Sequence, residues 1–150
     1  MRIAISTGGG DAPGLNAVIR AAVLSAISRG WDVLGIKRGF AGLMGEDEVV
    51  PLTRDSVRGI AHLGGTILRT TSRGNPFHYP RKRDDGVIVE EDRSDELIAR
   101  AAELGIDALI SIGGDGSLTI AKLLCDKGLK IVGVPKAGRS RATAGTATAG

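Results

Sequence analysis

The segment MRIAISTGGGDAPGLNAVIRAAVLSAI, residues 1–27, decides the fold. Met1–Ser6 is a short apolar run with β-branched residues, which predicts a strand that stops at a cluster of glycines. In Leu15–Ile27 the apolar residues recur at helical spacing, and Gly30 closes this predicted helix. Trp31–Ile36 then predicts a second strand. A strand, a glycine loop, a helix and a strand in this order form the βαβ unit of a parallel sheet.

A second unit of the same kind lies further along the chain. Its helix is expected at Ser94–Leu104, with Ser94 as the N-cap and Gly105 as the terminating glycine. The expected elements that follow are a strand at Ile106–Ile112, a loop at Gly113–Gly116, a helix at Ser117–Lys127 and a strand at Lys130–Val134. The sequence therefore predicts the α/β class, with a Rossmann-like parallel sheet and helices on both of its faces.

The middle and the end of the chain give weaker signals. For the middle we expect a short strand at Val49–Val50, a short helix at Arg54–His62, a turn and strand at Gly64–Leu68, an irregular loop at Arg69–Asp85 and an edge strand at Val87–Val89. Residues 137–150 contain no large apolar side chain that a core could bury. We therefore predict a folded domain at 1–136 and a low-complexity, disordered tail at 137–150.

Length and composition exclude several classes of protein. With 150 residues, 42% hydrophobic and 25% charged, the chain has the composition of one globular domain. We find no apolar run of the roughly 20 residues that span a bilayer and no secretory signal, so we expect a cytoplasmic protein without membrane association. The single cysteine, Cys125, excludes an internal disulfide, and its apolar surroundings predict a small buried side chain rather than a nucleophile. His62 and His78 have neither triad-like nor ligand-like spacing.

The net charge of +3 does not indicate nucleic-acid binding. Aromatic residues make up only 3% of the chain, which gives no stacking platform for bases. The basic run Arg81-Lys82-Arg83 is followed at once by Asp84-Asp85, so a solvated loop is the better interpretation. A modest positive excess also suits small phosphorylated ligands.

The first glycine loop, Gly8–Gly14, has the composition of a phosphate site. Glycines between a strand and a helix let backbone N–H groups approach a phosphate, and the helix N-terminus favours negative charge there. Asp11 would repel a phosphate unless a cation lies between them; alternatively, it caps the helix and needs no ligand. The loop matches neither the P-loop nor the dinucleotide-binding fingerprint.

Two further segments carry related chemistry. In the second glycine loop Asp115 lies among residues with almost no side chain, where it is well placed to reach a phosphate-bound Mg²⁺. Ser117 in the same loop either caps the following helix or bonds a phosphate. Arg73 follows the hydroxyl residues Thr70-Thr71-Ser72, a combination that suits phosphate but also fits a polar surface turn.

Taken together, these segments resemble one family. TGGGDAPGLNAVIR (7–20), GGTILRTTSRGNPF (64–77) and GIDALISIGGDGS (105–117) followed by VGVPK (132–136) are similar, in order and spacing, to the 6-phosphofructokinase family. The resemblance implies a glycolytic kinase, usually a homo-oligomer, that uses Mg²⁺ and transfers the γ-phosphoryl group of ATP to fructose 6-phosphate, giving fructose 1,6-bisphosphate. It also implies that residues 1–136 are the N-terminal, nucleotide-binding domain of that enzyme, which is incomplete here.

The resemblance assigns a role to several residues. Arg73 would stabilise the charge of the transferred phosphoryl group, and Asp115 would be the Mg²⁺ ligand. Arg20 matches a phosphate position for an allosteric effector, but Leu24 stands where another effector position usually has Arg, which leaves regulation open. The positions that match contacts to the nucleotide phosphates are Gly10, Arg73, Gly114, Asp115, Gly116 and Ser117.

Two positions bear on the phosphoryl donor. Gly116 favours ATP, because members that use pyrophosphate have a bulkier Asp there, which crowds a nucleotide. Lys136, in contrast, is found in pyrophosphate-using members and in some ATP-using ones. The resemblance therefore favours ATP and keeps pyrophosphate as an alternative.

The chain departs from the family after Lys136. The family continues with Thr-Ile-Asp-Asn-Asp, whose first Asp is the general base for the sugar hydroxyl, whereas this chain continues with Ala137-Gly138-Arg139. A shifted reading frame or a truncation would explain the change. We expect this chain to bind nucleotide and Mg²⁺ with little or no kinase activity. The alternatives are a non-catalytic nucleotide-binding or assembly module, and an NAD or lipid kinase with a similar Gly-Gly-Asp-Gly loop.

Overall fold

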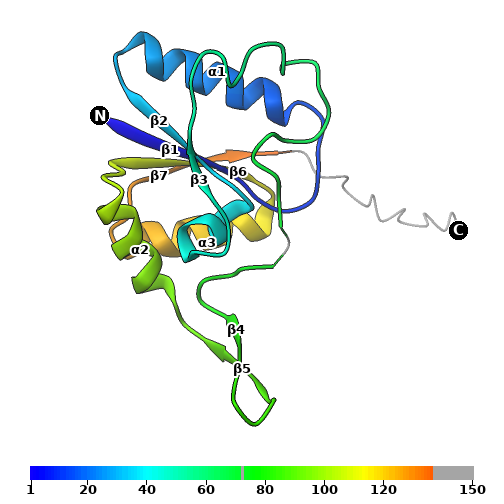
Figure 1. The fold of residues 1–150 in the computed structure, drawn as a ribbon, viewed down its shortest axis with the longest axis vertical. Coiled ribbons are helices and arrows are strands. Elements are labelled where there is room, and N and C mark those ends of the chain that lie inside the picture. Colours follow the sequence, from blue (N-terminus) through cyan, green and yellow to red (C-terminus); the bar gives the residue numbers. More distant parts are fainter. Residues whose placement is uncertain (72, 137–150) are drawn as a thin grey trace, which may run out of the picture.

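The computed structural model describes residues 1–71 and 73–136. Five strands lie side by side in the order β3-β2-β1-β6-β7, and β4 and β5 form a separate hairpin that projects from the body of the molecule (Figure 1). The predicted tail at 137–150 lies outside the described residues. The elements, of which η1 is a 3₁₀-helix, are β1 (Arg2–Thr7), α1 (Leu15–Ser28), β2 (Asp32–Ile36), η1 (Gly39–Met44), β3 (Val49–Pro51), β4 (Tyr79–Lys82), β5 (Ile88–Glu91), α2 (Ser94–Glu103), β6 (Ala108–Gly113), α3 (Asp115–Asp126) and β7 (Ile131–Pro135).

The main sheet is parallel except at one edge. β1 pairs in parallel with β2 and with β6, and β6 pairs in parallel with β7. The predicted strand at Val49–Val50 is present as β3, but it runs antiparallel to β2. The chain between Ile36 and Val49 turns back through η1 alone, and a direct return of this kind gives an antiparallel pair.

Both faces of the sheet are covered by helices, as the sequence predicts. Side chains alternate along a strand, so Ile3 and Ile5 of β1 pack in the cluster that contains α1, whereas Ala4 faces the other way. That second cluster contains Leu97 of α2 and Leu124 of α3, and both side chains are fully buried. Figure 1 shows α1 on one side of the sheet and α2 with α3 on the other.

The direction of the strand order reverses between β1 and β6. From β1 the chain passes through α1 to β2, whereas from β6 it passes through α3 to β7 on the opposite side. The carboxyl ends of the two strands are joined, because the N–H of Gly8 donates to the carbonyl of Ile112 over 2.9 Å. Open α/β sheets bind their ligands at such a switch point. Both glycine loops leave the sheet here.

The helix predicted at Arg54–His62 is wrong. The segment forms turns only, in which the N–H of Thr53 donates to Ser56 Oγ over 3.0 Å and the N–H of Ser56 donates to Thr53 Oγ1 over 3.2 Å. This reciprocal pair is the arrangement of a capping box, which satisfies donors at a helix start, but no helix follows it here. Gly59 also has a φ of 71°, which an α-helix does not allow.

The strand predicted at Gly64–Leu68 is wrong as well. The N–H of Ile67 donates to Asn16 Oδ1 over 2.8 Å, and the N–H of Leu68 donates to Thr66 Oγ1 over 3.1 Å. Side chains therefore occupy the backbone donors that a sheet ladder would need.

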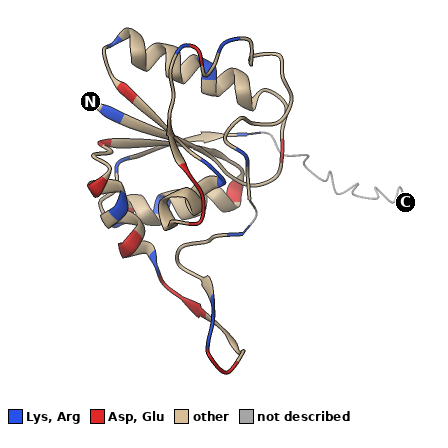
Figure 2. Ribbon diagram, viewed as in Figure 1, with Lys and Arg blue, Asp and Glu red and all other residues tan. Residues whose placement is uncertain are grey.

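The loop predicted at Arg69–Asp85 contains a strand, β4, which pairs antiparallel with β5. Pro80 and the charged residues next to it give no strand pattern in the sequence. Backbone pairing with β5 and the buried side chain of Tyr79 hold the strand. The predicted edge strand at Val87–Val89 corresponds to β5. Figure 2 shows both basic and acidic residues in this hairpin, and Arg81 Nη1 lies 3.2 Å from Glu91 Oε2. Two members of the basic run, Arg81 and Arg83, thus pair with the carboxylates of Glu91 and Asp85.

Two predictions about helix starts need correction. α2 begins at Ser94, but Arg93 holds the N-cap position, and the buried Ser94 hydroxyl donates to Asp92 Oδ1 over 2.6 Å. α3 begins at Asp115, so Ser117 lies inside the first turn and does not cap it.

The prediction that Cys125 is buried is also wrong. Cys125 is exposed, not buried, because α3 turns Ala121 and Leu124 into the core instead. Within the described part of the chain, no helix combines the length and the hydrophobicity that crossing a bilayer requires.

Candidate functional site

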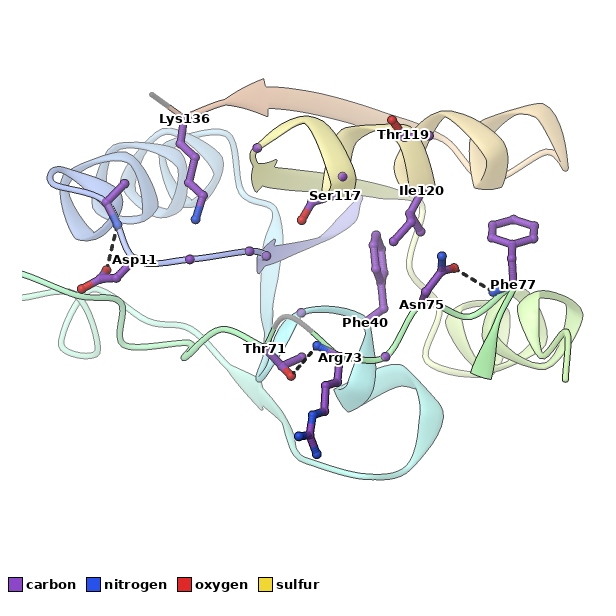
Figure 3. Close-up of a pocket in the computed structure, with 18 of the residues that line it drawn as sticks. Asp11, Phe40, Thr71, Arg73, Asn75, Phe77, Ser117, Thr119, Ile120 and Lys136 are labelled. Atoms are coloured by element: carbon purple, nitrogen blue, oxygen red, sulfur yellow. Dashed lines mark hydrogen bonds between the residues drawn. The ribbon is translucent and has the colours of Figure 1, made fainter. Parts of the chain in front are cut away.

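A large pocket lies where the two glycine loops leave the sheet. Its volume is about 1090 Å³, which is large enough for a nucleotide. Its walls come from the first glycine loop, the start of η1, the segment that carries Arg73 and the first half of α3, and Lys136 closes one side (Figure 3). The predicted site residues that line it are Gly10, Arg73, Gly114, Gly116 and Ser117. Asp115 is exposed and is not among the lining residues.

Glycines let α3 approach the strand ends. A β-carbon built on Gly8 would lie 2.5 Å from Ser117 Oγ, and one built on Gly113 would lie 2.5 Å from Ser117 Cβ. Real β-carbons do not approach so closely, so side chains are excluded at both positions. The close packing brings the N-terminus of the twelve-residue helix α3 to the pocket, where its dipole favours an anion.

Lys136 is the group in the pocket that most clearly lacks a partner. It follows β7, and its N–H donates to the carbonyl of Gly113 over 3.0 Å. Its ammonium Nζ is buried, and no atom in the described residues accepts a hydrogen bond from it. Burial lowers the pKa of this ammonium below its ordinary value of 10.5, an effect that the nearby Asp11 carboxylate partly offsets. Figure 3 shows the side chain pointing into the space between the Asp11 loop and Ser117.

Asp11 is not a helix cap, so that alternative is excluded. Gly14 holds the N-cap position of α1, and no side chain caps this helix. Instead, Asp11 Oδ1 accepts a hydrogen bond from the N–H of Ala12 over 3.0 Å. Its carboxylate therefore lines the pocket and is open to a cation.

The carboxylates fit Mg²⁺ only together with a phosphate ligand. Within 1–71 and 73–136, no group of three or more His, Cys, Asp or Glu side chains could hold a metal ion. Mg²⁺ commonly keeps several waters and binds one or two carboxylates plus phosphate oxygens. Asp11 lines the pocket, whereas the exposed Asp115 is the first residue of α3 and follows the lining residue Gly114.

The Arg73 side chain is turned away from the phosphate end of the pocket. Its N–H donates to Thr71 Oγ1 over 3.0 Å, which fixes the backbone, but the side chain is exposed. In Figure 3 the guanidinium lies on the opposite side of its own backbone from Lys136 and Ser117. Arg73 also lines a smaller pocket of about 560 Å³ together with Arg38. The backbone of Arg73 thus lies beside the pocket, but its guanidinium could contact a phosphate there only after a change of rotamer.

The pocket also has an apolar wall, which the sequence analysis missed. It consists of Phe40, Phe77, Ile120 and Leu123. Phe77 is held by its N–H bond to Asn75 Oδ1, 3.0 Å long. The helical spacing of Ile120 and Leu123 on α3 was the available signal, but it did not reveal that Phe40 and Phe77 lie opposite.

The remaining residues considered from the sequence lie elsewhere or serve the fold. Arg20 is on α1, where its Nη1 donates to the carbonyl of Val57 over 3.3 Å, and it does not line the pocket. His78 lines the pocket but pairs with Glu90 Oε2 at 3.0 Å.

A pocket at the switch point of the sheet, bordered by glycine loops and a helix N-terminus, is typical of α/β proteins that bind phosphorylated ligands. The chain belongs to the phosphofructokinase family: the family model described as "Phosphofructokinase" matches residues 2–142. The predicted resemblance to the phosphofructokinase family is thereby confirmed.

Individual relatives agree with this assignment. The chain is 49% identical over 136 residues to ATP-dependent 6-phosphofructokinase 2 of Clostridium perfringens, covering 90% of this chain and 37% of the relative. It is 45% identical over 137 residues to the pyrophosphate–fructose 6-phosphate 1-phosphotransferase of Amycolatopsis methanolica, covering 91% of this chain and 36% of the relative. Among solved structures, Pichia pastoris phosphofructokinase in the T-state matches with a TM-score of 0.75 and 33% identity, covering 91% of this chain and 15% of that chain.

The chain spans about 37% of the length of the first of these relatives. The family model and these relatives show the family to which the chain belongs. The activity of the whole enzyme is a proposal for this chain.

Proposed function

We propose that residues 1–136 are the donor-binding part of a 6-phosphofructokinase, which binds ATP with Mg²⁺ for transfer to fructose 6-phosphate. The observation that carries this proposal is the buried Lys136 ammonium, which has no acceptor among the described residues and faces the first glycine loop. Desolvating a cation without a partner is costly, so such a group is retained where a ligand supplies the missing anion. A donor phosphate has that charge.

Each predicted site residue has a role in this proposal. The backbone around Gly10, Gly114 and Gly116 would bind phosphate oxygens, and Ser117 would add a hydroxyl. Mg²⁺ would be held by Asp115, with Asp11 facing the same region, and its charge would offset that of the phosphoryl group in transfer. Arg73 would swing toward the pocket and stabilise the same charge.

ATP is the donor that the pocket fits better. Pyrophosphate has no apolar part, so it would leave Phe40, Phe77 and their apolar neighbours without a function. A nucleoside base would pack against such a wall. Pyrophosphate remains the alternative donor, since Lys136 and the Amycolatopsis methanolica relative both point to it.

Turnover by this chain alone is expected to be slight. In the transfer, the bond from the γ-phosphorus to the bridging oxygen breaks while a bond to the sugar O1 forms, and a base must take the hydroxyl proton. Residues 137–150 contain no Asp, Glu or His, so the expected base has no counterpart there. Losing such a base commonly costs about 10² to 10⁴ in rate.

A non-catalytic nucleotide-binding or assembly module is the second candidate, because the phosphate loops are intact while the expected base has no counterpart. The whole enzyme would act in the cytoplasm as a homo-oligomer, and both of these statements remain predictions.

Calorimetric titration of the 150-residue chain tests the proposal. ATP should bind in the presence of Mg²⁺, about tenfold more weakly with a chelator or with Asp115→Ala, because the charge of the phosphates is then less well neutralised. Pyrophosphate titrated in the same way tests the alternative donor. The absence of heat in every arm, from a chain shown to be folded by circular dichroism, would rule the site out.

A further inference from the structure

The segment 63–69, here called the strap, is irregular in conformation but firmly held. Leu68 within it is 1% exposed and packs so closely on the sheet that a β-carbon on Gly35 would lie 2.5 Å from Leu68 Cδ2. The N–H of Arg38 donates to the carbonyl of Leu68 over 2.8 Å. Arg69, which ends the strap, has a positive φ of 58°, an uncommon conformation for a residue with a β-carbon.

Asn16 of α1 makes the largest share of the side-chain bonds to the strap. Its side chain is buried, and Nδ2 donates to the carbonyl of Leu63 over 3.2 Å and to that of Gly64 over 3.4 Å. Its Oδ1 accepts the 2.8 Å bond from the N–H of Ile67. All the hydrogen bonds that this amide makes within the described residues are therefore to residues of the strap.

Thr7 anchors the end of the strap from the sheet. It is the last residue of β1 and is fully buried. Its Oγ1 donates to the carbonyl of Arg69 over 3.0 Å and lies 3.1 Å from Thr66 Oγ1. Thr7 therefore holds Arg69 in its uncommon conformation.

The strap lies between two walls of the pocket. Asn16 is in the first turn of α1, directly after the first glycine loop, while Thr70, Thr71 and Arg73 follow the strap. A β-carbon on Gly65 would be 3.9 Å from Asp11 Oδ2, so the strap also passes beside that carboxylate. The buried amide thus fixes the strap, which precedes the segment that carries Arg73, beside the loop that would hold the phosphates.

We propose that Asn16 is a positioning residue, which acts through the strap to hold the backbone of Arg73 where a change of rotamer would bring the guanidinium to the donor phosphate. This inference rests on the proposed function, since it requires Arg73 to contact the ligand. Asn16→Asp is the most specific test of this role. A carboxylate still accepts the hydrogen bond from the N–H of Ile67, but it no longer donates to the carbonyls of Leu63 and Gly64. Those carbonyls then face a buried oxygen, and the strap loosens.

A double-mutant cycle separates positioning from general stability. The affinity for ATP with Mg²⁺ is measured by calorimetry for the unaltered chain, Asn16→Asp, Arg73→Ala and the double variant. We expect each single change to weaken binding about tenfold and the double variant to bind no more weakly than Arg73→Ala. Additive losses, or unchanged affinity in Asn16→Asp, would overturn the proposal.

Hydrogen exchange of residues 63–71 supplies a readout that does not depend on the ligand. Asn16→Asp should speed exchange at Ile67 while the later turns of α1 stay protected. If Asn16→Asp does not fold, Thr7→Val enters the same cycle, with Thr7→Ser as the variant that restores the hydroxyl. Faster exchange without loss of affinity overturns the positioning role and leaves the proposed function intact. No binding by the unaltered chain, or no effect of Arg73→Ala, contradicts the proposed function, and this inference with it.

Discussion

The ammonium of Lys136 lies against Gly9: a β-carbon built on that glycine would be 3.5 Å from Lys136 Nζ. Gly9 has a φ of 76°, so the loop turns sharply at the point where the buried charge meets it. The lysine thus follows the last strand of the described sheet while its charge reaches the loop that follows the first strand.

Replacing Lys136 by Met should weaken ligand binding and stabilise the fold. Met fills a similar space without a charge, so the desolvation cost of the ammonium disappears. We expect the affinity for ATP with Mg²⁺ to fall at least tenfold, while the free energy of unfolding rises by about 1 kcal/mol. Calorimetry and urea unfolding measure the two quantities. Loss of both affinity and stability would show that Lys136 acts as a structural residue.

The pH dependence of stability should reveal the same group. Because the pKa of Lys136 is lowered in the folded chain, the burial penalty is fully present below the folded pKa and disappears as the pH rises toward the ordinary value of 10.5. In that window the unfolded chain binds the proton that the folded chain has released, so the contribution of Lys136 to unfolding free energy increases with pH. Urea unfolding at a series of alkaline pH values, compared with Lys136→Met, isolates this contribution. Identical pH profiles for the two proteins would contradict it.

Ligand affinity should have the opposite pH dependence. ATP supplies the anion that favours the charged lysine, so binding should weaken as the pH rises through the lowered pKa. Affinities measured across the alkaline range test this expectation, and in Lys136→Met the step should be absent.

Much of the fold can be predicted from the sequence, because the spacing of apolar residues shows which face of a helix or strand is buried. Ile19 and Val23 recur at helical spacing on α1, and both lie in the core against β1. The prediction fails at Arg54–His62, where Gly59 has a positive φ that a helix does not allow, and at Gly64–Leu68, where side-chain contacts decide the conformation. In the second segment those contacts come from Asn16, which is distant in the chain and gives no local signal.

The candidate site likewise has features that follow from local sequence patterns and features that depend on contacts between distant residues. The glycine loops are visible in the sequence, since Gly-rich turns after strands are a local pattern. The apolar wall and the burial of Lys136 are not, because they depend on Phe40, Phe77 and α3 meeting across the pocket. The direction of Arg73 is equally invisible, since an exposed side chain is fixed by no local rule.

The adjacent glycines Gly113, at the end of β6, and Gly114, at the N-cap of α3, should differ in their tolerance of a methyl group. Gly113→Ala places a β-carbon against Ser117 and should reduce the free energy of unfolding by about 1 to 3 kcal/mol. Gly114→Ala is the matched control, because a β-carbon there meets nothing within 4 Å, and the change should be within about 0.5 kcal/mol. Adding Ser117→Gly to Gly113→Ala should recover part of the loss. Equal losses at the two glycines would show that the tight packing against α3 is not what requires Gly113.

The apolar wall should distinguish the two candidate donors. Leu123 is 43% exposed and lines the pocket from α3, so Leu123→Ala removes apolar surface at little cost to the core. Because only a nucleoside base would contact that surface, we expect the affinity for ATP with Mg²⁺ to fall about three- to tenfold while that for pyrophosphate is unchanged. Val132→Ala is the control, since this side chain is 60% exposed on β7 and does not line the pocket. Competition calorimetry with both donors measures the difference. If Leu123→Ala leaves ATP binding unaltered, or if only pyrophosphate binds the unaltered chain, then the wall does not serve a base and pyrophosphate becomes the better-supported donor.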